Sequence, residues 1–96
     1  MLNERIRKLR QERNWSQVDL AKKLNVTKQS VSNWENDNIQ PSIEMLVKLA
    51  EVFSVSTDYI LGLEERRYLE ITGLSDVEIA HVQLVIRDLV ERGNIK

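Results

Sequence analysis

The sequence of 96 residues contains no cysteine, so it can form neither a disulfide nor a cysteine-based metal site. Its apolar runs are short, and none approaches the roughly 20 residues that a membrane-spanning helix needs. The N-terminus is charged and does not resemble a signal peptide. The one histidine, His81, has no metal ligand or nucleophile at a useful spacing. We therefore expect a cytoplasmic protein without a metal ion or other cofactor.

An excess of positive charge is also missing, because the formal net charge is −1. The charges are nevertheless divided unevenly along the chain. Residues 1–41 carry eight Lys/Arg and five Asp/Glu, a net charge of +3, whereas residues 42–96 carry six and ten, a net charge of −4. A phosphate backbone needs only a local basic face. On charge alone, a DNA-binding face and a merely solvated helix surface are equally good interpretations of the basic half.

Proline occurs once and alternating β-branched residues are missing, whereas signals for the start of a helix recur. Each signal is a small polar residue that can accept hydrogen bonds from free backbone N–H groups. The residues expected to open helices are Asn3, Ser16, Thr27, Ser42, Ser56 and Ser75. The sequence predicts an all-α fold with a compact five-helix bundle over residues 1–62. A linker or helical extension over residues 63–74 and a C-terminal helix over residues 75–96 follow it.

The segment from Ser16 to Asn36 meets the requirements of a helix-turn-helix, in which the second of two helices enters the major groove of DNA. Ala21 is small enough for the two helices to cross. Asn25 tolerates the left-handed backbone of a tight turn, and Val26 can pack that turn against the core. The second helix has Val31 and Trp34 on its inner side. Exposed polar residues follow its start, namely Lys28, Gln29, Ser32 and Asn33.

The run Ser16-Gln17-Val18-Asp19-Leu20-Ala21, followed by Val26-Thr27 and Val31-Ser32-Asn33-Trp34-Glu35, resembles the phage-repressor helix-turn-helix family (Cro and cI-like, or Xre). The resemblance covers residues 3–62. It implies a lambda-repressor-like, DNA-binding bundle that regulates transcription, and we expect a repressor. Asn25 stands where the family usually has glycine. Asp37, in the loop after the second helix, would face phosphates unfavourably.

The resemblance also implies roles for individual residues. The base-contacting positions are Lys28, Gln29, Ser32 and Asn33, and the phosphate-contacting positions are Ser16, Gln17, Lys22, Thr27 and Asn36. Arg10 and Glu35 resemble a structural ion pair between the first and third helices. The chemistry is suitable, because Gln and Asn can pair with adenine through two hydrogen bonds and Lys can donate to guanine. Taken singly, such polar residues are usually solvated surface, but within the complete motif base contact is the better interpretation.

The last helix carries two apolar groups when it is projected at 100° per residue. One broad stripe comprises Ile79, Val82, Val85, Ile86, Leu89 and Val90, and we expect it to join two copies of the chain. Val77, Ala80 and Leu84 lie on a different side. A helix that is apolar on two sides could pack on its own bundle with one side and on a second copy with the other. The alternative is that this helix simply completes the core of the monomer.

The sequence therefore predicts a homodimer that reads an inverted repeat in double-stranded DNA. The alternative function is an antitoxin-type protein, which would bind a partner toxin through its C-terminal helix and repress its own promoter. An enzyme is not expected, because the sequence offers no activated nucleophile, carboxylate pair, phosphate-binding loop or metal constellation.

Overall fold

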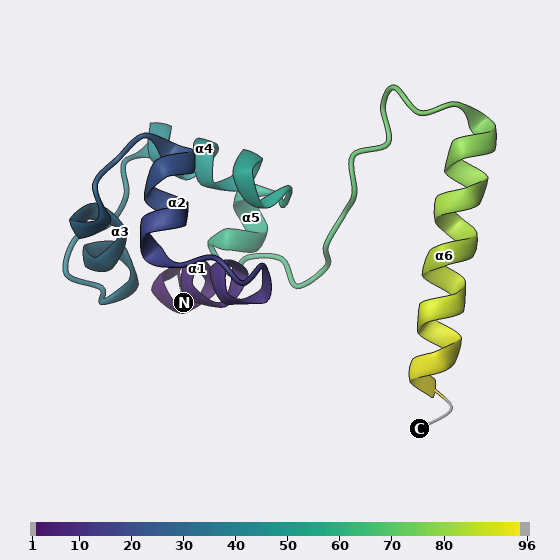
Figure 1. Ribbon diagram of the computed structural model, residues 1–96, viewed down its shortest axis with the longest axis horizontal. Helices are drawn as coiled ribbons and strands as arrows, with labels where there is room; N and C mark the ends of the chain where they lie inside the picture. Colours follow the sequence, from purple (N-terminus) through teal and green to yellow (C-terminus); the bar gives the residue numbers. More distant parts are fainter. Residues whose placement is uncertain (1, 95–96) are drawn as a thin grey trace.

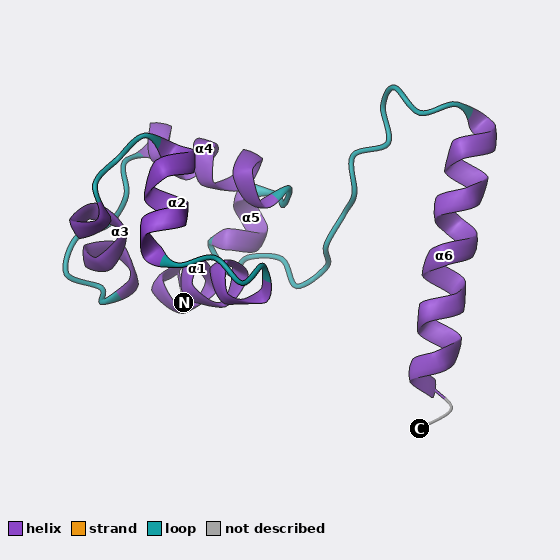
Figure 2. Ribbon diagram, in the orientation of Figure 1, coloured by secondary structure: helices purple, strands orange, loops and turns teal. Residues whose placement is uncertain are grey.

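Six helices account for most of residues 2–94, which are the residues that this computed structural model describes (Figures 1 and 2). They are α1 (Leu2–Glu12), α2 (Gln17–Leu24), α3 (Lys28–Glu35), α4 (Ile43–Phe53), α5 (Thr57–Ile60) and α6 (Asp76–Asn94). The described residues contain no strand, and the prediction of an all-α fold is confirmed. None of the described helices is both long and apolar enough to cross a membrane.

Side-chain caps fix where five of the helices begin. The hydroxyl groups of Ser16, Thr27, Ser42 and Ser56 each accept a hydrogen bond from the backbone N–H three residues later. At the start of α6, the Ser75 hydroxyl accepts from the N–H of Glu78 at 3.1 Å. These bonds satisfy N–H groups that have no partner inside a helix. The predicted starts of α2 to α6 are confirmed, whereas α1 already begins at Leu2.

Left-handed residues end α2 and α4. Asn25 has a φ of 57°, which lets the N–H of Val26 bond to the carbonyl of Ala21 at 2.9 Å. Ser54 adopts the same conformation after α4, with a φ of 55°. The turn at Asn25 is therefore the predicted one, and Ser54 shows that a second turn of this kind can form without asparagine or glycine.

The core lies among α1 to α5. Its buried apolar residues are Ile6, Leu9, Leu20, Ala21, Leu24, Val31, Trp34, Leu49, Ala50, Phe53, Tyr59 and Ile60. Trp15 packs at the edge of this core, with its ring stacked on Phe53 at 5.9 Å between centroids. Both tryptophans therefore serve packing, Trp34 on the inner side of its helix as the sequence predicted and Trp15 at the edge of the core.

After α5 the chain continues without a helix to the start of α6, and its first part is tied to the bundle at Tyr59. Arg67 donates to the Tyr59 hydroxyl and, at 3.1 Å, to the carboxylate of Glu12. The Arg5 guanidinium lies 4.0 Å from the centroid of the same ring and 3.4 Å from Glu65. We call these five residues the Tyr59 clasp. It sets the direction in which the linker leaves the bundle.

Figure 1 shows α6 standing apart from the bundle, at the far end of this linker. Most of the apolar side chains of α6 are exposed, including Val77 and Leu84 on one side and Leu89 on the other. In this structure neither apolar side packs on the bundle, so the possibility that one side does so is not borne out, and the alternative that α6 completes the monomer core is wrong. The physical reason is that α1 to α5 already close a core without it.

Candidate nucleic-acid interface

The helix α3 separates a buried side from a polar side. Val31, Trp34 and Glu35 are buried and hold α3 on the bundle. At 100° per residue, five polar positions (Lys28, Gln29, Ser32, Asn33 and the C-cap residue Asn36) occupy an arc of about 140° on the other side, and the half-buried Ser30 lies beyond its edge. Of these, Lys28, Gln29 and Asn36 are exposed, whereas Ser32 and Asn33 are half-buried. The structure thus brings the five polar α3 positions together on one face.

Two hydrogen bonds between side chains run along this face, each spanning one helical turn. The Gln29 amide donates from Nε2 to Oδ1 of Asn33 at 3.1 Å. The Asn36 amide donates from Nδ2 to the Ser32 hydroxyl at 3.2 Å, and its Oδ1 accepts from Arg7 at 3.3 Å. These bonds restrict the rotamers of four polar side chains before any ligand is present. Lys28 remains the cation at the start of the face.

The start of α2 offers two N–H groups that an anion could use. The Ser16 hydroxyl accepts from the N–H of Asp19 at 3.0 Å, and the Asp19 carboxylate accepts from the N–H of Ser16 at 2.8 Å. By helix geometry, the N–H groups of Gln17 and Val18 have no carbonyl partner within α2. These two groups are the available donors. The negative charge of Asp19 lies beside them and opposes a phosphate at this position.

A network around the buried Glu35 joins α1, α2 and α3. Its carboxylate accepts from Arg10 at 2.7 and 2.9 Å and from the Gln17 amide at 3.2 Å. The Arg7 guanidinium lies 3.6 Å from the same carboxylate and donates to the Glu35 carbonyl at 3.0 Å. The Glu35 side chain has no exposed area. Gln17 therefore braces α3 directly, while the N–H of the same residue remains at the surface of α2.

The electrostatics of Glu35 lead to a prediction about pH. Burial alone would raise the pKa of Glu35, but the hydrogen bonds from Arg10 and Gln17 and the charges of Arg10 and Arg7 outweigh it and lower that pKa below its ordinary value of 4.5. The unfolded chain therefore binds this proton more readily than the folded one. The stabilisation from ionised Glu35 is complete above pH 4.5 and is lost as the pH falls through the lower folded value.

We expect the urea midpoint of the wild type to fall below pH 4.5 more steeply than that of Glu35→Gln, which has no proton to gain at this position. Exposed carboxylates such as Asp19 and Glu78, whose pKa values are also lowered, are present in both proteins. Their contribution cancels when the two pH profiles are subtracted. Parallel profiles would show that Glu35 does not carry this pH dependence.

The structure uses part of the basic half for packing rather than for a ligand. Arg13 donates to the carbonyls of Leu9 and Phe53. Arg10 is taken up by Glu35, and Arg5 by the Tyr59 clasp. The exposed cations are Arg7, Lys8, Lys22, Lys23 and Lys28. Arg7 is the addition to the predicted site. Its spacing of three residues from Arg10 on one helix was the signal that could have placed it there.

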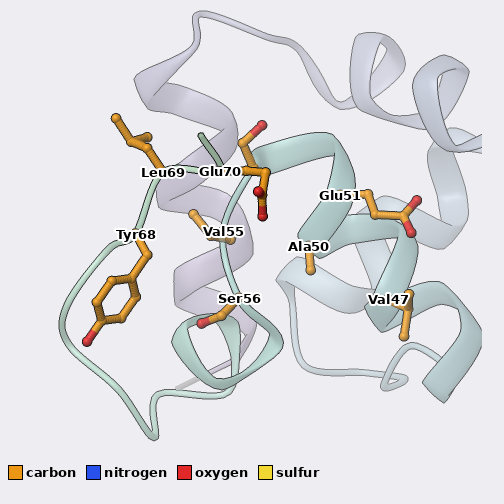
Figure 3. A pocket seen from close by; sticks show the side chains of 9 residues that line it. Val47, Ala50, Glu51, Val55, Ser56, Tyr68, Leu69 and Glu70 are labelled. Atoms are coloured by element: carbon orange, nitrogen blue, oxygen red, sulfur yellow. The ribbon is translucent and has the colours of Figure 1, made fainter. Parts of the chain in front are cut away.

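A surface hollow elsewhere on the bundle has the wrong charge for nucleic acid. It is lined by the C-terminal half of α4, the turn at Val55 and Ser56, and the linker at Tyr68 and Leu69 (Figure 3). The carboxylates of Glu51 and Glu70 flank it, and no basic residue lines it. Because acidic groups repel phosphate, we exclude this hollow from the nucleic-acid interface.

Residues 6–60 match the family model described as helix-turn-helix. The transcriptional regulator ImmR of Bacillus subtilis is 39% identical over 64 residues, which are 67% of this chain and 50% of ImmR. The chain thus spans half the length of that relative. The regulator SinR of Bacillus subtilis is 33% identical over 94 residues, covering 97% of this chain and 80% of SinR.

Two kinds of solved structure resemble this one. The P22 c2 repressor bound to a synthetic operator superposes with a TM-score of 0.63 at 31% identity, over 67% of this chain and 97% of the repressor chain. A complex of SinR with the protein SinI gives a TM-score of 0.61 at 27% identity, over 96% of this chain and 99% of the matched one. The first match covers two thirds of the present chain, whereas the second covers nearly all of it.

Proposed function

The chain belongs to the helix-turn-helix family, and we propose from this premise that it represses transcription by binding operator DNA with the exposed face of α3. The observation that carries the proposal is the face itself, with Lys28, Gln29 and Asn33 directed away from a buried side that fixes α3 to the bundle. A helix presented in this way can enter the major groove, where side chains near its start meet base edges. The likeness to the operator-bound P22 c2 repressor supports the same orientation.

Phosphate contacts in this proposal come from both sides of α3. The N–H groups of Gln17 and Val18 lie at the positive end of the α2 dipole and suit one phosphate. Positive charge for these phosphate contacts comes from the exposed Lys22, Lys28 and Arg7, since the second half of the chain is acidic. The hydroxyls of Ser16 and Thr27 are acceptors in helix caps but keep a hydrogen that can be donated to a phosphate oxygen.

We further propose that two copies bind one inverted repeat and that they pair through α6. The stripe of α6 (Ile79, Val82, Val85, Ile86, Leu89 and Val90) remains largely exposed in a single chain, although water disfavours such a continuous apolar surface. Residues Tyr68, Leu69 and Ile71 extend this surface, since they line one groove together with Ile79, Ile86 and Leu89. In the paired state the two α3 helices would stand about 34 Å apart, one turn of DNA.

A second candidate function is the capture of another protein by the same stripe. The complex of SinR with SinI, which matches 96% of this chain, favours this candidate as a property of a relative. An antitoxin that represses its own promoter is one form that it could take. Purification decides between the candidates, because a homodimer supports the first and a stoichiometric second protein supports the other.

Selection of bound sequences from random double-stranded DNA at a stated salt concentration tests the proposed interface. Gln29→Ala should relax the choice of base at one position of the selected site, because each bidentate contact discriminates by about 1–3 kcal/mol. Lys22→Ala should instead weaken binding to all sequences and lower the salt dependence by about one phosphate contact. The two variants are controls for each other. Unchanged selectivity in Gln29→Ala would mean that the interface lies elsewhere.

A further inference from the structure

The hydrogen bond from Gln29 Nε2 to Asn33 Oδ1, at 3.1 Å, fixes how two neighbouring amides of α3 present themselves. An amide group has one oxygen that accepts and one nitrogen that donates twice. Once one hydrogen of the Gln29 amide is directed at Asn33, the amide can no longer exchange its oxygen and nitrogen freely. The same bond uses an acceptor position on Asn33. The consequences for the two residues differ.

For Gln29, the bond leaves the pattern that adenine requires. The Gln29 amide nitrogen carries two hydrogens, one on the same side as the amide oxygen and one on the opposite side. When the opposite hydrogen is donated to Asn33, the oxygen and the remaining hydrogen can both face the groove. Adenine presents the N6 amino group as a donor and N7 as an acceptor in the major groove. Gln29 Oε1 can accept from N6 while the second Nε2 hydrogen donates to N7. Guanine offers two acceptors there and cannot satisfy Oε1.

For Asn33, the bond favours the donor side of its amide. Its Oδ1 already accepts one hydrogen bond from Gln29, so the Nδ2 group is the part of the amide that remains wholly free for a base. Acceptors in the major groove are N7 and O6 of guanine and O4 of thymine, as well as N7 of adenine. The Asn33 carbonyl accepts from the N–H groups of Asn38 and Ile39, at 2.9 and 3.3 Å. These bonds hold the backbone at Asn33 against the following loop, and its side chain is half-buried.

We propose that Asn33 determines specificity at two base pairs: it holds Gln29 in the orientation that selects adenine, and it donates to a guanine or thymine itself. The proposal rests on the proposed function of α3, and it adds which bases are chosen and why. A bidentate Asn–adenine contact by Asn33 is disfavoured, because its Oδ1 would have to accept from adenine N6 while it also accepts from Gln29. Asn33 is thus a positioning residue for one base and a contacting residue for another.

The test compares the wild type with Asn33→Ala and Asn33→Asp in selection from random double-stranded DNA, with Gln29→Ala included to identify the column that Gln29 reads. Asn33→Ala removes the acceptor, so the adenine preference in the Gln29 column should fall by about fivefold or more, together with the preference in the Asn33 column. Asn33→Asp keeps an acceptor for Gln29 but has no donor. It should retain the adenine and replace guanine or thymine by cytosine, whose N4 amino group donates.

The possible outcomes distinguish a failure of this inference from a failure of the proposed DNA recognition by α3. If Asn33→Ala changes one column only and leaves the adenine preference intact, the two amides act independently and the inference is overturned, while α3 remains the recognition helix. If the wild type enriches no sequence, the proposed function fails and the inference fails with it. Thermal unfolding of each variant checks that a lost preference does not reflect a lost fold, and Asn33→Asp, which keeps one preference while changing the other, cannot be explained by unfolding.

Discussion

Replacing Glu35 by alanine is expected to lower the free energy of unfolding of the bundle by about 3–5 kcal/mol, because it leaves a mostly buried Arg10 without its partner. The Glu35 side chain has no exposed area, and the Arg10 side chain is 12% exposed. The two are joined by two hydrogen bonds, at 2.7 and 2.9 Å. Removal of the carboxylate would also free the Gln17 amide and leave Arg7 with only the Glu35 carbonyl and Asn36 as partners, so contacts of α3 to both α1 and α2 would be lost.

The expected loss is large relative to the whole free energy of unfolding of the bundle. A domain of about 60 residues has a stability of roughly 3–9 kcal/mol. Glu35→Ala should therefore lose a third or more of the stability of the bundle, and circular dichroism during urea titration would show the lowered midpoint. Glu65→Ala is the matched control, since Glu65 is 82% exposed in its ion pair with Arg5 and such pairs contribute little. Equal midpoints for the two variants would show that the Glu35 network does not stabilise the bundle.

The parts of this structure that could be predicted from the sequence are those that depend on residues close together in the chain. The caps at Ser16 and Thr27 and the turn at Asn25 depend on residues within five positions of each other, and all three form as expected. The polar face of α3 follows in the same way from helical periodicity. What sequence reasoning missed depends on how distant segments meet. Arg7 joins the site because α1 docks against α3, and the Tyr59 clasp forms because the linker returns to α1 and α5.

For α6, too, the sequence predicts the helix itself but not what its apolar side chains contact. Its existence and its cap at Ser75 are local properties, and both were predicted. The surface that covers its apolar residues is not a local property. Periodicity shows that Val77 and Leu89 lie on different sides of the helix, but not that the bundle leaves both of them exposed. A partner for the stripe therefore has to be sought outside the single chain.

Leu89→Asp tests whether that partner is a second copy, and it is expected to convert a dimer into a monomer at micromolar concentration. Leu89 is 60% exposed in the single chain and lies in the groove between α6 and the linker. A carboxylate there would lose its water when two stripes meet, and an unpaired buried charge costs several kcal/mol. Sedimentation equilibrium measures the result. Val77→Asp is the control, because Val77 is 81% exposed and lies on another side of α6.

The DNA binding of Leu89→Asp distinguishes the contribution of pairing through α6 from that of base recognition by α3. A dimer engages two half-sites at once, and such linkage increases affinity by about 100-fold to 10,000-fold over one site. Leu89→Asp should lose this advantage on a full inverted repeat while it binds an isolated half-site as the wild type does, because α3 and its Glu35 network are distant in sequence and untouched. Equal losses on both DNAs would instead point to damage in the bundle. A variant that remains dimeric would refute pairing through the stripe, and the exposed surface of α6 would then favour the second candidate function, a different protein as its partner.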